Sequence, residues 1–268
     1  MSWRFLRTPK WIARHLAVLL LVLAMIWAGF WQLRRLDDKR DHKALVESRQ
    51  EQPALPVEDV IPADADIGSD AVDAILYRPV RAIGTYAADE TVVVENRTFN
   101  GAPGAWVLTP LRLGEGVAVV VNRGFIGFTR GGSIEPPAPP PGSVEVGGLV
   151  FPSQQRGSFG ATDPDSGRLD VLARVDLDRF DAQVDDDLLP AYIQLATTVP
   201  PEPGFEAADA PQLVALGPPE VDEGPHLGYA AQWFIFTTIA VGGYALLLRR
   251  VARDEARPPP AEVAAEAT

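Results

Sequence analysis

The stretch LAVLLLVLAMIWAGFW, from Leu16 to Trp31, contains only apolar residues. With its apolar neighbours it reaches roughly 20 residues, and a helix of that length crosses the hydrocarbon core of a bilayer. A second apolar stretch runs from Leu227 to Leu248, with Gln232 as its only strongly polar interior residue. We therefore predict two transmembrane helices, although the mean hydropathy of the whole chain is close to zero.

The first stretch has one competing interpretation, a cleaved signal peptide, because basic residues precede it. Its apolar run is long for a signal peptide, it ends in large aromatic residues, and no small-x-small cleavage site follows it. We therefore expect an uncleaved membrane anchor.

The flanks of the second stretch set the expected orientation. No lysine or arginine lies between Arg179 and Arg249, whereas four arginines follow the stretch. Because basic residues next to membrane helices stay in the cytoplasm, both termini are expected to be cytoplasmic and the middle of the chain extracytoplasmic. A composition rich in arginine, alanine and proline, without a transit peptide, indicates the plasma membrane of a bacterium.

Composition excludes several classes of function. Residues 49–225 hold 28 acidic residues, 11 arginines and no lysine, which argues against nucleic-acid binding. The chain has no cysteine, so thiol redox chemistry and c-type heme attachment through C-x-x-C-H are excluded. Its only methionines are Met1 and Met25, which excludes a methionine-rich copper site. No phosphate-binding loop and no Ser-His-Asp set can be recognised, so we expect no enzymatic activity.

Between about residues 75 and 200 the pattern changes to short β-branched runs separated by turn residues. Leu177, Phe180 and Val184 share one face behind an Asp cap, which predicts a single short helix. The predicted fold is thus an α+β membrane protein in which two transmembrane helices flank a small antiparallel sheet or β-barrel. The expected strands lie in YRPVRAIGTY, TVVVENR, AWVLTPL, VAVVVNRG, SVEVGGLV, RLDVLARVD and AYIQLATT.

These patterns also divide the chain. Charged helix-forming residues continue the first transmembrane helix to about Gln50, and Pro53 and Pro56 end it. The expected parts are a basic cytoplasmic N-terminus (1–10), the first transmembrane helix (11–33), its extension (34–52), an acidic linker (53–74), the extracytoplasmic β-rich domain (75–225), the second transmembrane helix (226–248) and a disordered cytoplasmic tail (249–268).

His226 lies at the expected outer end of the second transmembrane helix, with Tyr229 and Trp233 below it on one face. Spacing alone favours an interfacial role, because aromatic side chains anchor helices at the headgroups. The functional alternative is an axial ligand or contact for a planar cofactor held between two helices. Gln232 is expected to be buried and to hydrogen-bond a neighbouring helix.

The first helix leaves the membrane in GFWQLRR, which puts Trp31, Gln32, Arg34 and Arg35 at the expected depth of His226. Arginines at this depth commonly extend their guanidinium groups to the headgroups. Guanidinium groups also bind the carboxylates of a cofactor in a two-point manner. Both interpretations stay open at the level of sequence.

Two motifs of the β region have structural explanations. Arg123 ends a buried strand in VVVNRGF, where Gly124 allows a tight turn. DPDSGRLD, from Asp163 to Asp170, resembles a calcium loop but lacks its full ligand series, so we expect a turn.

Four segments stand out together: GFWQLRRLDDK, YRPVRAIGTY, WVLTPLRLGEGVAVVVNRGFI and HLGYAAQWF. In sequence and in order they resemble the Surfeit locus protein 1 family, assembly factors for heme a-type cytochrome c oxidase. The resemblance covers roughly residues 24–250. Two departures are that Gly224 and Pro225 stand where the family usually has paired asparagines, and that Asp38 replaces an aromatic residue.

The resemblance implies a membrane assembly factor that aids the insertion of heme a into oxidase subunit I and binds heme a transiently. The implied partners are the oxidase subunits, subunit I first, a cytochrome bc complex, and the lipid bilayer. An alternative is a stably bound scaffold subunit of the oxidase or of a cytochrome bc–oxidase supercomplex; a heme- or lipid-modifying enzyme is disfavoured. The implied heme contacts are His226 as axial ligand, Trp31, Arg34 and Arg35 on the facing helix, and Tyr229, Gln232 and Trp233 on the near helix.

Overall fold

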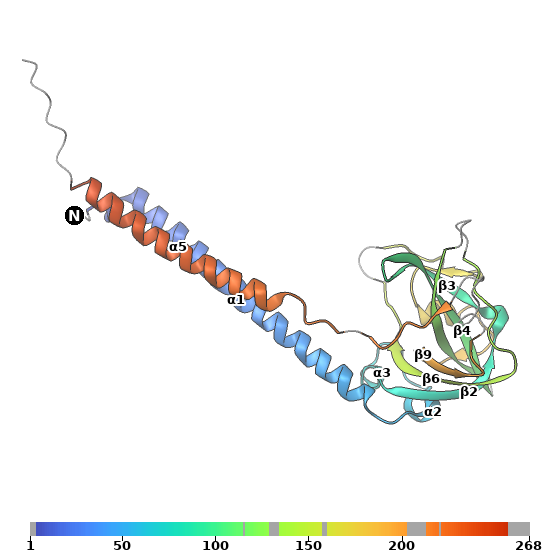
Figure 1. Ribbon diagram of the computed structural model, residues 1–268. Coiled ribbons are helices and arrows are strands. Elements are labelled where there is room, and N and C mark those ends of the chain that lie inside the picture. The colour runs from blue at the N-terminus through green and yellow to red at the C-terminus, as the bar shows by residue number, and fades with distance from the viewer. Residues whose placement is uncertain are drawn as a thin grey trace, which may run out of the picture. The chain divides into compact units, whose positions relative to one another are not determined.

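The computed structural model describes residues 4–114, 116–128, 134–156, 160–202, 213–219 and 221–256 (Figure 1). The expected disordered tail falls mainly on residues 257–268, which lie outside the described residues. The chain forms two compact units, residues 1–44 together with 221–268, and residues 45–220.

Two long helices make up the first unit. A 3₁₀ turn, η1 (Arg4–Arg7), precedes α1 (Pro9–Gln50), and α5 spans His226–Asp254. Helix α1 continues unbroken beyond its apolar part, because residues 34–50 are mostly good helix formers with opposite charges three and four residues apart. Its end at Gln50 agrees with the expectation from sequence, although its last turn belongs to the second unit.

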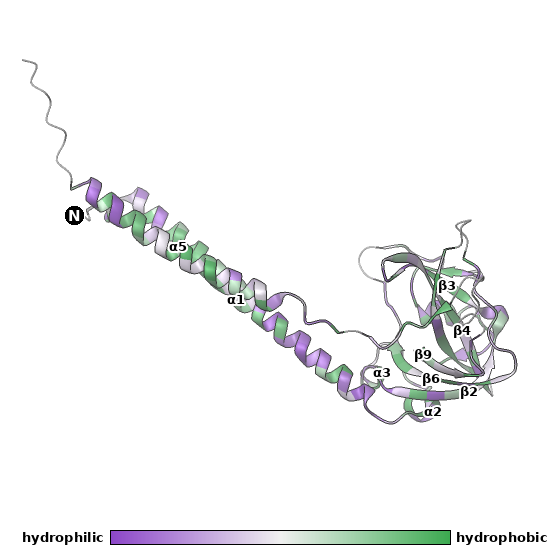
Figure 2. Cartoon of the chain, in the orientation of Figure 1, coloured by the Kyte–Doolittle hydropathy of each residue, from purple (hydrophilic) through white to green (hydrophobic). Residues whose placement is uncertain are grey.

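Hydrophobic residues make up much of both helices (Figure 2). Leu20, Ile239 and Leu246 keep 67%, 64% and 65% of their surface exposed. Both helices are long and apolar enough to cross a membrane. Because such a surface is stable in hydrocarbon rather than in water, it indicates a membrane protein.

The helices run antiparallel along a narrow seam of shielded residues. Gln32 of α1 contacts His226 of α5 at one end, and His15 contacts Tyr244 at the other. Shielded residues recur at alternating intervals of four and three, which is the spacing of closely packed helix pairs. The seam consists of His15, Val18, Val22, Met25, Gly29, Gln32 and Leu36 of α1, with His226, Ala230, Trp233, Thr237, Ala240 and Tyr244 of α5.

The second unit is a five-stranded β-barrel with short strands added outside it. The ring order is β2-β6-β9-β5-β4, and pairing of β2 with β4 closes it. This agrees with the predicted β-rich domain. The ring strands are β2 (Pro79–Tyr86), β4 (Ala102–Gly114), β5 (Val117–Gly127), β6 (Ser143–Pro152) and β9 (Ala191–Val199); the others are β1 (Leu55–Pro56), β3 (Val92–Phe99), β7 (Val171–Leu172), β8 (Asp187–Leu188) and β10 (Leu213–Val214), with a 3₁₀ turn η2 (Ala88–Glu90).

One pairing in the ring departs from the expected antiparallel sheet. Strand β9 runs parallel to β5, with Val121 opposite Ile193, whereas the other four ring pairings are antiparallel. A closed ring with five strands cannot alternate in direction throughout, so it needs one parallel pair. Expecting only antiparallel pairs was therefore wrong once the sheet closed.

The stretch expected to be an acidic linker contributes to the barrel core instead. It contains two short helices, α2 (Val57–Val60) and α3 (Asp70–Asp73). Val57, Ile61 and Val72 are at most 1% exposed and pack in the same apolar cluster as the barrel strands. The acidic residues dominate the composition of this stretch, but its few apolar residues are the ones that determine where it lies.

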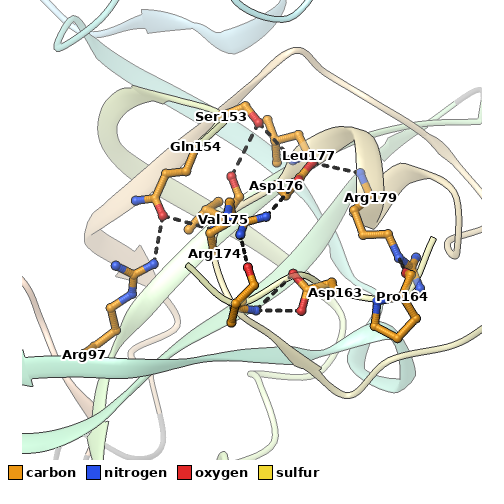
Figure 3. A network of polar contacts seen from close by, with 12 residues as sticks. Arg97, Ser153, Gln154, Asp163, Pro164, Arg174, Val175, Asp176, Leu177 and Arg179 are labelled. Carbon is orange, nitrogen blue, oxygen red and sulfur yellow. Dashed lines mark hydrogen bonds and ion pairs between the residues drawn. The ribbon is translucent and has the colours of Figure 1, made fainter. Parts of the chain in front are cut away.

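The predicted short helix is α4 (Leu177–Asp181), which covers a second apolar cluster on the outside of the barrel. The Asp176 carboxylate caps it and accepts a hydrogen bond from the backbone N–H of Arg179 at 3.1 Å (Figure 3). The segment that follows β6 holds the start of the helix in place. Ser153 Oγ accepts from the backbone N–H of Leu177, and Gln154 Oε1 accepts from that of Val175.

Candidate functional site

His226 is the first residue of α5, and its half-buried imidazole faces α1. Its Nδ1 lies 2.8 Å from Oε1 of Gln32. A tight turn sets this position: Gly224 has a φ of +69°, and the Asp222 carboxylate accepts a hydrogen bond from its N–H at 3.0 Å. The positive φ thus gives the glycine at position 224 a conformational reason.

The contact with Gln32 determines which imidazole nitrogen of His226 is free. An amide oxygen can only accept a hydrogen bond, so this contact is a hydrogen bond in the tautomer that carries its proton on Nδ1. The lone pair then resides on Nε2, the nitrogen that remains open to a metal ion. A Cβ atom at Gly224 would lie 3.4 Å from Nε2, so the missing side chain leaves that edge of the ring less covered.

Most of the other predicted contacts lie on one side of the seam. In an antiparallel helix pair, positions at equivalent offsets from the seam on the two helices border the same groove. Trp31 and Arg35 of α1 border the same groove as Tyr229 and Gln232 of α5. We call this side the arginine flank; it comprises Arg14, Ala17, Leu21, Ala24, Ala28, Trp31 and Arg35 of α1, with Tyr229, Gln232, Phe236, Ile239, Gly243 and Arg250 of α5.

The expectation that Gln232 is buried is wrong. Gln232 is exposed, because it lies on the outer part of the arginine flank, and the amide that crosses between the helices is that of Gln32. Arg34 lies about 200° around α1 from Gln32 and therefore faces away from α5. Trp233 lies in the seam itself.

Arg35 is available to an anionic group. It lines a recess of about 620 Å³ together with Trp31, Arg34, Asp37 and Asp38. Its Nη1 lies 4.0 Å from the carboxylate of Asp38, and both side chains are more than half exposed. Such an exposed pair contributes little free energy, so a carboxylate of a ligand can replace Asp38.

Ionic contacts hold the loop in front of His226 against α1. The Glu223 carboxylate lies 3.0 Å from Nε of Arg40 and 4.0 Å from Nζ of Lys43. All three side chains are partly exposed, so these contacts position the loop more than they stabilise the protein.

A second histidine joins the two helices at their other end. His15 of α1 hydrogen-bonds through Nδ1 to the hydroxyl of Tyr244 of α5. Trp11 lies one turn before it, with the Arg14 guanidinium 4.6 Å from its ring. His15 is therefore a seam contact comparable to His226.

The barrel contains a buried polar cluster around Arg123. Arg123 and Glu202 are both fully buried and form a two-point ion pair at 2.6 and 3.0 Å. Nη1 of Arg123 also donates to the carbonyl of Pro137 at 2.9 Å. Burial, and secondarily the charge of Glu202, raises the pKa of the nearby Tyr86 hydroxyl. Arg123 thus ties β5 to the proline connector, a role that its sequence motif did not reveal.

The acidic loop that begins at Asp163 is irregular and bends at residues 165–167. Its carboxylate accepts hydrogen bonds from the backbone N–H of Ala173 at 3.0 and 3.1 Å. Across the residues that the structure describes, no group of three or more His, Cys, Asp and Glu side chains is arranged to hold a metal ion.

The residues that build this arrangement lie in a region that matches a known protein family. The model of the SURF1 family, the Surfeit locus protein 1 family, matches residues 19–238, from within α1 through the barrel to the first half of α5. The chain belongs to the SURF1 family.

Relatives with SURF1-like names match over nearly the whole chain. An uncharacterized SURF1-like protein of Mycobacterium bovis is 28% identical over 270 residues, which cover 96% of this chain and 92% of the relative, and one of Mycobacterium tuberculosis gives the same values. A SURF1-like protein of Rickettsia felis is 23% identical over 244 residues, which cover 88% of this chain and 97% of the relative.

The matched SURF1 range includes both members of the Gln32–His226 pair but excludes His15 and Tyr244. Gln32 is the site residue to which sequence reasoning assigned no role. The available signal was its register: it follows Met25 and Gly29 at the seam intervals of four and three, so its amide had to face the partner helix.

Proposed function

We propose that this SURF1-family protein is a non-catalytic membrane assembly factor for heme a-type cytochrome c oxidase, which aids the insertion of heme a into subunit I. The observation that carries the proposal is the His226–Gln32 pair between two apolar helices, in a chain of this family. The proposed location is the bacterial plasma membrane, with both termini cytoplasmic and the barrel outside.

The residues at the helix pair suit heme a, a flat apolar macrocycle that carries carboxylates and a long hydrocarbon tail. Nε2 of His226 is a suitable axial ligand for heme iron, and Gln32 orients the ring and keeps the proton on Nδ1. Arg35 offers a guanidinium to a carboxylate. Trp31 and Tyr229, 47% and 49% exposed, offer aromatic surface to the macrocycle.

Heme a is cargo in this proposal, and its redox chemistry belongs to the oxidase that receives it. The chain holds, orients and releases it. Subunit I is the proposed first partner because it receives the heme, and the acidic segment between the helices favours a basic docking surface on the oxidase or on a cytochrome bc complex.

The test is purification of the tagged full-length protein in mild detergent from cells that make the oxidase, with heme a and oxidase subunits quantified per tagged chain. We compare the wild type with His226→Ala, and His15→Ala serves as the matched control because it also removes a histidine from the seam. We expect substoichiometric heme a that His226→Ala abolishes and His15→Ala preserves.

The outcomes separate the assembly factor from a permanent scaffold. Oxidase subunits near one per chain, unaffected by His226→Ala, would identify a stably bound accessory subunit and overturn the proposal. Heme a that survives His226→Ala would reject His226 as the ligand.

A further inference from the structure

The ring of the barrel has a gap between β2 and β4. Among the residues that the structure describes, the register joins these two strands only at the last two residues of β2. On the same edge, β1 pairs with Val80 and Arg81 near the start of β2, while β6 occupies the other edge. Residues 82–84 lie between these pairings, and no described strand pairs with them on this edge. This short edge of β2 is therefore open to another strand.

The pairing of β1 with β2 stops at a residue that cannot continue it. Pro56 has no N–H group to donate to the sheet, and helix α2 begins at the next residue, Val57 (Figure 1). An added segment would continue along β2 from the point where β1 ends. Strands β1, β7, β8 and β10 are each two residues long and pair with longer strands, so an addition of this length is in keeping with the sheet.

A recess of about 790 Å³ lies at this gap. Its inner wall is apolar, because Ile61 and Leu189 belong to the barrel core and are only 1% and 4% exposed. Leu113 and Val117 pack against the same core and line the recess beside them. A volume of this size is typical of ligand-binding pockets. The recess thus joins the open edge of β2 to the apolar interior.

The outer rim of the recess is charged. Glu58 lies in the first turn of α2, and Arg81 and Glu145 lie on β2 and β6. All three side chains are exposed. Within the described part of the chain, neither carboxylate has an ion-pair or hydrogen-bond partner. Because two carboxylates face one guanidinium, the rim is negative overall and favours a basic ligand.

We propose that the gap between β2 and β4 is a docking site for an extended segment of a partner protein in which apolar and basic residues alternate. Main-chain hydrogen bonds to the open edge of β2 provide affinity. Side chains of a strand point alternately to opposite faces, so apolar ones enter the recess toward Ile61 and Leu189. The basic ones lie on the outer face, beside Glu58 and Glu145. The site goes beyond the proposed function, because it belongs wholly to the barrel unit and does not involve the helix pair.

The test is binding of a synthetic peptide to the purified full-length protein in detergent, measured by the fluorescence anisotropy of the labelled peptide. The probe is a capped peptide of alternating arginine and valine. One comparison peptide has glutamate in place of arginine, and another carries N-methyl groups on the backbone amides of one edge. We expect only the arginine–valine peptide to bind, because the rim repels glutamate and N-methyl groups remove the donors that pair with β2.

Charge reversal locates the site on the barrel. We expect Glu58→Lys with Glu145→Lys to lower the affinity for the arginine–valine peptide about tenfold and to allow the glutamate–valine peptide to bind. The matched control is Glu135→Lys with Asp165→Lys, which makes the same change of net charge at exposed positions outside the recess. This control should change the affinity by about twofold or less, because salt screens distant surface charges.

Three results would overturn the proposal. If the wild type does not bind the arginine–valine peptide, the recess is not a docking site of this kind. If the N-methylated peptide binds equally well, no strand is added to β2. If both double variants have equal effects, the peptide responds to net charge and not to the recess. None of these results bears on heme carriage, which the His226→Ala comparison decides separately.

Discussion

At the scale of residues, two polar side chains depend on partners that lie far away in the sequence. Gln32 holds the proton on Nδ1 of His226 and so leaves Nε2 open. In the barrel, Arg123 forms an ion pair with Glu202, and both side chains are fully buried. A guanidinium removed from water in this way is tolerated only while its carboxylate partner neutralises it.

Replacing one member of that pair should therefore weaken the barrel strongly. We expect Glu202→Gln to lower the free energy of unfolding by about 3–5 kcal/mol, because it leaves the buried charge of Arg123 uncompensated. Urea unfolding of the full-length protein in detergent, followed by tryptophan fluorescence, measures the loss.

Glu145→Gln, the same change at an exposed position of β6, is the control, with an expected effect within about 0.5 kcal/mol. If the two substitutions lower the free energy of unfolding equally, the buried ion pair contributes no more to stability than an exposed glutamate does.

At the scale of elements, the seam between α1 and α5 depends on a close approach at Gly29. Gly29 is buried, and the ring of Phe234 occupies the space that a side chain there would need. In a membrane such approaches favour helix pairing, because dispersion contacts replace the hydrophobic driving force that lipid removes.

Gly29→Ala should loosen this packing. We expect a loss of about 1–3 kcal/mol from overpacking, seen as a lower midpoint of detergent-induced unfolding of the helices by circular dichroism.

Gly242→Ala is the control on α5, because a Cβ atom there meets nothing within 4 Å. It should be neutral or slightly stabilising, since alanine favours the helix over glycine. A Gly29→Ala protein as stable as Gly242→Ala would contradict the close approach.

At the scale of the whole molecule, the barrel core includes the chain that follows α1. Val57, Ile61 and Val72 lie in the same cluster as residues of β2, β5, β6 and β9. The stretch between α1 and the first long strand is therefore structural, despite its acidic composition.

Ile61→Ala tests this role, since Ile61 is 1% exposed. We expect it to lower the free energy of unfolding of the barrel by about 2–5 kcal/mol, through lost burial and a residual cavity. Leu55→Ala in the same stretch is the control, because Leu55 is 36% exposed and should change stability by about 1 kcal/mol or less. If Ile61→Ala leaves the free energy of unfolding of the barrel unchanged, the stretch is a linker after all.

The sequence by itself determined what depends on neighbours along the chain. The length and apolarity of two runs specify α1 and α5, alternation specifies the strands, and the side chain of Asp176 specifies the start of α4. The position of His226 at the head of the second apolar run made it a candidate, and the family segments added the SURF1 assignment.

Only the tertiary structure decided what depends on pairing between distant residues. Contact of β2 with β4 closes the barrel and forces the parallel β5–β9 pair, and Glu202 gives Arg123 its partner. The rotation of α1 relative to α5 selects Gln32 over Gln232 and turns Arg34 away. A helix period fixes which residues share a face, but which face meets the partner is settled by the packing of both helices together.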